Sequence, residues 1–368
     1  MSGVTTSPDP MIPEIPFRVP SPPRNSVLRP AWLVVALSIV LATAGAQTSV
    51  QLGGEIPPEV ETIYERGLEY LAKTQTEDGS WRSRSEHGIT GLCLMAFLAG
   101  GEDPNFGRYR LQVKRALRSI IQGQDSNGFI PNSMYHHGFA MLALAEAYGA
   151  VDEETLWDGS EDDEGRQSIA RTLERAIQLA VEAQERNRWG GWRYSPTSTD
   201  ADTSVTGSVL MGLLACRNAG LAVPDATIEN ALVYMRRNTA SSGFVAYSGG
   251  IGGGGESMAR SAVATLVYSV GRKRKWEEFD AALGHITQRL DHKETAHIHY
   301  YYYYMAQALF QGDMDSWNQW NRDMSRMLSE QQSGEGFFSG SNGEAYGTAM
   351  SLLTLALNYR FLPIYERF

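Results

Sequence analysis

Two aspartates lie just before an apolar stretch in the middle of the chain. Asp200 and Asp202 are separated by one alanine, and Thr203 follows them. Residues 205–216 then carry the small and apolar side chains of a buried helix. An aspartate at this place commonly caps the helix by accepting a hydrogen bond from a backbone amide. It can also serve as a proton-donating acid when its neighbours tune it. Both interpretations stay open, with Asp202 as the principal candidate and Asp200 in support.

Histidines take equivalent places before other apolar stretches. When the stretches are aligned, His87, His136 or His137, and His299 fall at the level of Asp202. Imidazole nitrogens and carboxylate oxygens are the donors of zinc sites, so zinc is an alternative if these side chains converge. A histidine at a helix start more often hydrogen-bonds a loop. We therefore expect no cofactor.

Aromatic and polar side chains at this level are candidates for binding without catalysis. Five consecutive tyrosines, Tyr300 to Tyr304, are rotated by about 100° from one residue to the next on a helix, so they cannot all face one ligand. A cavity with such walls and a few polar groups suits an apolar or amphipathic molecule. The candidate ligand-binding residues are His87, His137, Thr203, Met258, His299, Tyr302, Tyr303 and Tyr346.

The elements that position these residues are helix pairs. Arg66 to Trp81 ends a helix with apolar Tyr70 and Leu71, then brings Gln75, a reversal at Asp78-Gly79 and an aromatic residue. Glycine tolerates the positive φ that a helix end requires, and Gln75 can satisfy carbonyls left without partners.

The same pattern recurs along the chain and predicts an architecture. Weaker copies are centred on Gln124, Gln184, Gly243, Gln332 and, without the Gln or the Gly, His285. Each copy is followed by a small-residue apolar helix, which makes six helix pairs. Arranged as inner and outer rings, they place the starts of all six inner helices around one mouth. We expect an all-α fold, an (α/α)6 toroid over residues 59–368.

The first copy resembles a known motif. Arg66-Gly67, Tyr70-Leu71, Gln75 and Gly79-Ser80-Trp81 look like the full QW motif of squalene-hopene cyclases, whose repeats also run through protein prenyltransferase β subunits. The resemblance covers roughly residues 60–365. It implies the toroid fold of the terpenoid cyclase and protein prenyltransferase superfamily. The chain is most similar to exported bacterial "prenyltransferase and squalene oxidase repeat" proteins, a group without an assigned reaction.

The resemblance also implies two activities to weigh. Class II cyclases protonate an alkene with the middle aspartate of a DxDDTA sequence, and Asp200-Ala201-Asp202-Thr203-Ser204 resembles it in place and content. Aligned on the Asp-Thr step, Ala201 occupies the position of the acid. Protein prenyltransferases hold zinc with Asp, Cys and His, but Cys216 lies too deep along its helix to match.

The N-terminal region differs in composition from the repeats. Residues 1–30 are rich in proline and should be disordered. Arg24 and Arg29 precede an apolar run from Ala31 to Ala46 that ends in a small-x-small pattern. This predicts a signal peptide cleaved after Ala46, with a retained N-terminal membrane anchor as the alternative. Residues 47–58 are a linker. The long leader is also consistent with translation from Met11.

Composition limits the partners. Hydrophobic residues make up 42% of the chain, enough for a large core, and the net charge of −10 argues against nucleic acid as a partner. The leading hypothesis is an exported repeat protein, periplasmic, extracellular or anchored outside the cytoplasmic membrane. It would bind a hydrophobic or isoprenoid-like molecule, or a protein segment, in its central cavity. The alternatives are an acid-initiated terpene cyclase or prenyl-transferring enzyme, and an extracytoplasmic scaffold. The sequence does not indicate an oligomeric state.

Overall fold

The computed structural model describes residues 56–81, 86–101, 103–158, 166–249 and 255–366. Leu52–Phe368 is one compact unit. The expected disordered region (1–30), the signal or anchor segment (31–46) and the linker up to residue 55 lie outside the described residues. No helix in the described ranges combines the length and the apolar character that crossing a membrane requires.

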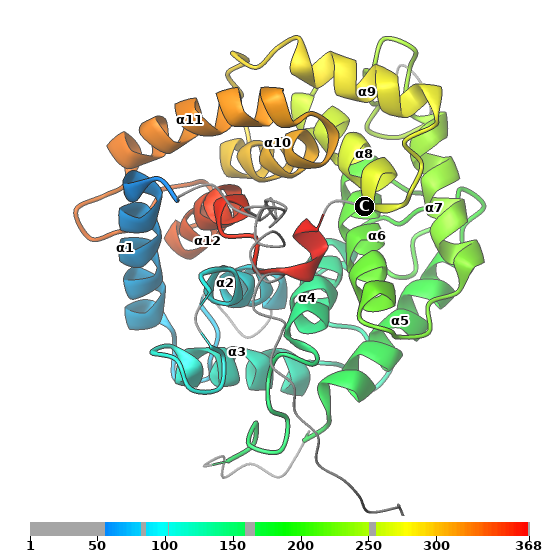
Figure 1. Cartoon of the computed structure of the whole chain (residues 1–368). Coiled ribbons are helices and arrows are strands. Elements are labelled where there is room, and N and C mark those ends of the chain that lie inside the picture. Colours follow the sequence, from blue (N-terminus) through cyan, green and yellow to red (C-terminus); the bar gives the residue numbers. More distant parts are fainter. Residues whose placement is uncertain (1–55, 82–85, 102, 159–165, 250–254, 367–368) are drawn as a thin grey trace, which may run out of the picture. The chain divides into compact units, whose positions relative to one another are not determined.

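Twelve α-helices, and no β-strand, make up the described part of the chain. The odd-numbered helices surround the even-numbered ones, as Figure 1 shows. The outer helices are α1 (Pro58–Thr74), α3 (Arg110–Gln122), α5 (Ile169–Glu185), α7 (Asp225–Arg237), α9 (Glu277–Thr287) and α11 (Met314–Gln331). The inner helices are α2 (His87–Ala99), α4 (Met134–Ala147), α6 (Thr203–Asn218), α8 (Met258–Val270), α10 (Ile298–Gly312) and α12 (Glu344–Leu355).

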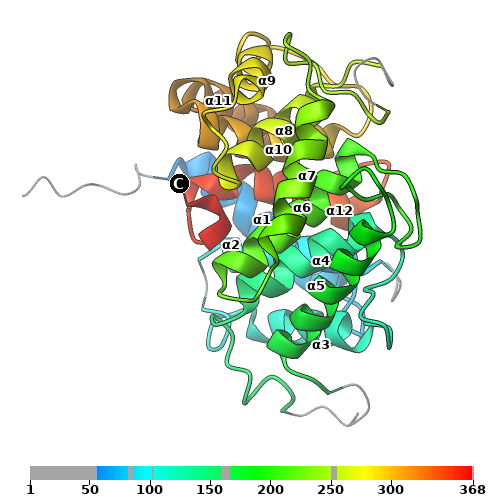
Figure 2. The ribbon, with the colours of Figure 1, turned by 90° about the vertical axis from the view of Figure 1, so that its right-hand side faces the viewer.

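The inner helices form a closed ring. Each contacts the next one in the chain, and α12 returns to contact α2. Every residue of α2 is buried, as expected of a helix that is apolar all round. The outer helices bury one face only, and α5 and α7 lie in front of α4 and α6 in the side view of Figure 2. The double ring of six helix pairs expected from the repeats is confirmed.

The repeated glutamines connect neighbouring outer helices. Gln75 donates to the carbonyl of Gly79 in its own loop (3.0 Å) and to that of Gln112 in α3 (2.9 Å). Gln124 and Gln184 make the same two bonds to their own loop and to the next outer helix. Gln332 donates to Gly336 and, across the join, to Ile63 of α1, at 2.9 Å each. These bonds explain the motif, since each side chain joins a carbonyl of its own loop to a carbonyl near the start of the next outer helix.

The glycine of each motif has the backbone conformation that the turn requires. Gly79, Gly128, Gly190, Gly243 and Gly336 all have φ between 80° and 95°. Trp81 and Trp192 follow two of these turns, are buried, and donate their indole N–H to carbonyls of α1 and α5. Glycine is needed there because a side chain at positive φ is strained.

The chain ends across the far side of the ring, where the inner helices finish. Two short 3-10 helices, η1 (Ala356–Asn358) and η2 (Pro363–Tyr365), follow α12. Leu362 and Ile364 of this tail are buried, so the tail packs against the ring. Both cysteines, Cys93 and Cys216, are buried and unbridged.

Candidate functional site

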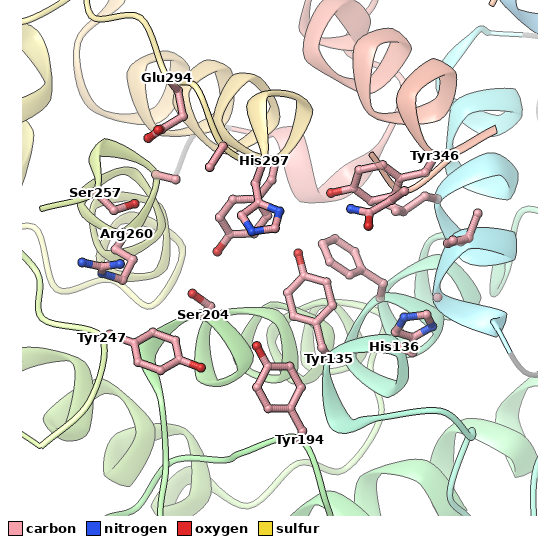
Figure 3. A pocket seen from close by; sticks show the side chains of 18 of the residues that line it. Tyr135, His136, Tyr194, Ser204, Tyr247, Ser257, Arg260, Glu294, His297 and Tyr346 are labelled. Carbon is pink, nitrogen blue, oxygen red and sulfur yellow. The ribbon is translucent and has the colours of Figure 1, made fainter. Parts of the chain in front are cut away.

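A pocket opens at the mouth formed by the starts of the inner helices. Its volume is about 650 Å³. Each inner helix contributes to its wall from the first turns, through Gly88, Tyr135, Ser204, Ala259, Tyr300 and Tyr346 respectively. Figure 3 shows several of these side chains around the cavity. Because all six helices start here, their positive dipole ends face the pocket and favour a negative charge on its occupant.

Aromatic side chains make up much of the pocket wall. Tyr135 contacts Phe139 and Tyr300, with ring centroids 5.1 Å and 6.2 Å apart. Burial raises the pKa of Tyr135 and Tyr300 far above the usual tyrosine value, so both hydroxyls stay neutral. The aromatic residues of the wall are Tyr135, Phe139, Tyr194, Tyr247, Tyr300 and Tyr346. These rings combine flat apolar faces with polar edges.

Arg260 brings a positive charge to one side of the pocket. It donates from Nε to the carbonyl of Val245 (2.9 Å) and also donates to the carbonyl of Gly255. None of the described carboxylates forms an ion pair with it. Its guanidinium lies 6.0 Å from the ring of Tyr247, and that of Arg193 lies 5.5 Å from the same ring. Arg260 is therefore a cation whose bonds within the protein are to backbone oxygens.

Carboxylates also line the pocket. Glu256 pairs with Arg289 and lies 3.3 Å from His285, and Glu294 lies 3.8 Å from His292. Burial lowers the pKa of Arg260, and the charge of Glu294 acts in the opposite direction. Glu86 is the third carboxylate of the wall, and Glu256 already has a cationic partner in Arg289.

Asp202 is a helix cap whose carboxyl lies behind the pocket wall. Its Oδ1 accepts a hydrogen bond from the Val205 amide (2.8 Å), and its side chain is fully buried. Burial raises the pKa of Asp202 to about 6, although the Val205 amide, Arg193 and the Tyr247 hydroxyl oppose that rise. Asp200 is exposed and pairs with Arg193 at 2.9 Å. Neither aspartate belongs to the wall of the mouth pocket.

Of the predicted histidines, His136 lines the mouth pocket, whereas His137, His299 and His87 are held against loops and neighbouring helices. His137 accepts from the Ile130 amide (3.1 Å) and contacts the Ala176 carbonyl (3.1 Å). His299 contacts the Ser339 carbonyl (3.0 Å) and the Ser351 hydroxyl (3.1 Å). His87 is buried against Gly123, where even a methyl group would overlap its ring. Burial lowers the pKa of His87 and His137 to about 4, so both are neutral.

The described residues do not supply the set of ligands that the zinc alternative requires. Within the described residues, no three side chains of His, Cys, Asp or Glu gather closely enough to hold a metal ion. His137 and His299 have both ring nitrogens engaged with loop or helix groups. These histidines position the mouth of the ring rather than converge in it.

The other predicted residues divide between wall and core. Tyr346 lines the pocket. Thr203 donates to the Ala246 carbonyl (3.0 Å) and so holds the loop that carries Tyr247. Met258 is core. Tyr302 faces Met327 of α11, and Tyr303 packs on Phe139 in the interior. Neither tyrosine lines the mouth pocket; the member of that run that does is Tyr300.

Three important wall residues were not predicted: Tyr135, Tyr247 and Arg260. Tyr300 was considered only as one member of the run Tyr300 to Tyr304 and was not among the candidate binding residues. Tyr135 precedes the two histidines that the alignment considered, and Arg260 lies two residues after Met258. A search for polar residues anywhere in the first turn of each inner helix would have found both. Tyr247 lies in a loop, and no helical period predicts its direction.

Comparison with solved structures identifies this architecture. A type II terpene cyclase from Scytonema, solved with geranylgeranyl dihydroxybenzoate, superposes with a TM-score of 0.54 over 83% of this chain and 98% of its own, at 13% identity. The chain is an α/α toroid. A GH76 alpha-mannanase from Bacteroides thetaiotaomicron has the same toroid, with a TM-score of 0.55 over 82% of this chain and 96% of its own, at 11% identity.

Other comparisons add no activity to this toroid. A protein from Actinoplanes matches with a TM-score of 0.55 over 82% of this chain and 99% of its own, at 14% identity. No protein-family model and no curated protein matches the chain. Identities this low show the fold alone, because one fold supports many unrelated reactions.

Proposed function

We propose that the protein binds an amphipathic organic molecule in the mouth pocket, with an isoprenoid-like apolar body and an anionic end. The observation that carries this proposal is a wall with six aromatic side chains and an arginine that no described carboxylate neutralises. Pockets for such ligands are mostly apolar, with a few polar groups that fix orientation.

The apolar body of the ligand would lie against Tyr135, Phe139 and Tyr300. These rings already contact one another in series, so they form one continuous surface. Ile89 and Leu92 of α2 extend that surface. Burial of an isoprenoid unit here gains roughly 25 cal/mol for each Å² of apolar surface removed from water.

The anionic end would meet Arg260 at the start of α8. Arginine suits carboxylate and phosphate groups because its N–H donors form a planar fork. The helix starts add to the attraction. The cyclase of similar fold was solved with a ligand named as geranylgeranyl dihydroxybenzoate, which joins an isoprenoid to an aromatic acid. That chemistry supports an isoprenoid acid as the first compound to test.

Binding of farnesoic acid, measured by isothermal titration calorimetry, tests the proposal. Tyr300→Ala should weaken binding by about tenfold or more, since truncating a central aromatic anchor typically costs about 2 kcal/mol, and 1.4 kcal/mol is a factor of about ten. Tyr302→Ala is the matched control, because this tyrosine is two residues away and faces α11. Arg260→Gln should weaken the binding of farnesoic acid but leave the binding of farnesol, which has no carboxylate, unchanged. No binding by the wild-type protein, or equal losses in both tyrosine variants, would refute the proposal.

A second candidate is acid-initiated cyclisation, favoured by one observation. Burial gives Asp202 a pKa of about 6, high enough to keep some of it protonated near neutral pH. Its carboxyl would have to reach a ligand that the pocket wall separates from it. Incubation with geranylgeranyl dihydroxybenzoate, followed by mass spectrometry for an isomeric product, decides between binding and cyclisation. Product from the wild type and none from Asp202→Asn would establish the enzyme.

A further inference from the structure

A second pocket lies at the opposite end of the ring. It has a volume of about 670 Å³, beside the ends of α2, α4 and α6 and against the chain tail at Phe361, Leu362 and Pro363. Its walls are largely small or apolar, including Leu98 and Ala145. No function proposed for the mouth pocket uses it.

One ionisable side chain is buried in this wall. Glu146, near the end of α4, is only 6% exposed and lines the pocket. Its Oε2 accepts a long hydrogen bond from the Ile364 amide, at 3.4 Å. Among the described residues, no lysine, arginine or histidine forms an ion pair with it. A buried carboxyl without a cationic partner is costly and is a common mark of a functional group.

The groups facing Glu146 are themselves acidic. Burial raises the pKa values of Cys216 on α6 and Tyr303 on α10, and the charge of Glu146 adds to both rises. Glu366 on the tail adds to the rise in the pKa of Glu146 itself. Burial is the main cause that raises the pKa of Glu146 to about 8, while the Ile364 amide lowers it. Asp103 and Tyr148 lie elsewhere on the same wall. The negative ends of three helix dipoles meet here as well, so the field strongly favours a cation.

We propose that this pocket binds a small organic ammonium ion, whose charge pairs with Glu146 and whose short apolar body fills the space beneath the tail. A metal ion is less suited, because no group of three ligands exists within the described residues. An ammonium group needs only one carboxylate and nearby carbonyl oxygens, and its hydrocarbon part matches the walls. Binding displaces the proton of Glu146 into solvent.

Titration of the full chain with cyclohexylammonium tests this site, with cyclohexanol as the neutral control. An alkyl ammonium keeps its charge up to about pH 10, whereas a carboxyl of pKa about 8 is about one-tenth ionised at pH 7 and about nine-tenths at pH 9. The association constant should therefore rise about tenfold between these pH values. At pH 7 about one proton should be released for each ion bound, as calorimetry in buffers of different ionisation enthalpy would measure.

Variants separate the carboxyl from the general field. Glu146→Gln should weaken the binding of cyclohexylammonium by about tenfold or more and leave the binding of cyclohexanol unchanged. Glu185→Gln is the control, since Glu185 is exposed at the end of α5 and does not line this pocket. Binding that is absent in the wild type, independent of pH, or equal in wild type and Glu146→Gln would overturn the proposal. The proton count needs no variant and decides the matter even if a variant misfolds.

Discussion

Replacing Glu146 with glutamine should raise the free energy of unfolding at neutral pH. The folded-state pKa of this carboxyl is about 8, against 4.5 for a free glutamate, because burial disfavours its charge. Between these two values the folded protein holds a proton that the unfolded chain has released. Stability therefore falls as pH rises through this window, by about 1.4 kcal/mol per unit. Glutamine is neutral, has nearly the same shape, and still accepts the Ile364 amide.

The structure sets the size and pH dependence of that gain. pH 7 lies about 2.5 units above the pKa of a free glutamate, 4.5, and each unit costs the wild-type protein about 1.4 kcal/mol. Glu146→Gln should therefore be more stable than the wild type by about 3 kcal/mol at pH 7. At pH 4 the gain should vanish, and above pH 8 it should level off. Urea unfolding followed by circular dichroism at pH 4, 5.5, 7 and 8.5 measures it.

The matched control for this prediction is Glu185→Gln, on the exposed surface of the protein. It should change the free energy of unfolding by no more than about 0.5 kcal/mol at any of these pH values. A stability gain for Glu146→Gln that is independent of pH, or a loss of stability at pH 7, would refute the claim that Glu146 is buried without a cationic partner.

Three further predictions concern the ring and the leader. Gln332→Ala removes one hydrogen bond within its own loop and one that joins the last repeat to the first. It should lower the free energy of unfolding by about 2 kcal/mol in urea titration, whereas Gln331→Ala, at an exposed position, should leave it unchanged. Gly336→Ala should lower the free energy of unfolding by more than about 1 kcal/mol in the same assay, because φ at Gly336 is 95° and an added Cβ would overlap backbone atoms. Gly334→Ala, where an added Cβ has open space around it, should change it little. N-terminal sequencing of protein purified from its own host should begin at the residue after Ala46 if the leader is a cleaved signal; a chain that still carries residues 31–46 would contradict cleavage.

The fold could be predicted from sequence because its requirements are local and repeated. Gly79 forms the turn after one outer helix, Gln75 joins that turn to the next outer helix, and both requirements return in other pairs. The closure bond from Gln332 to Ile63 required only that the last repeat follow the same pattern as the first. The helix starts were therefore placed correctly around one mouth.

The pocket wall was harder to predict because it depends on helix rotation and on loops. Tyr300, Tyr302 and Tyr303 belong to one run of five tyrosines, yet of these three only Tyr300 lines the mouth pocket. The rotation that separates them is set by packing of α10 on its neighbours, which no single repeat encodes. Tyr247 reaches the pocket from a loop held by Thr203, a long-range contact with no periodic signal.

Photo-crosslinking tests the central claim most directly. A farnesoic acid analogue that carries a diazirine near the middle of its chain should label peptides containing Tyr135 or Tyr300, and unlabelled farnesoic acid should suppress that labelling. Labelling confined to the outer helices, or labelling that excess farnesoic acid leaves unchanged, would contradict a ligand site at the mouth of the ring.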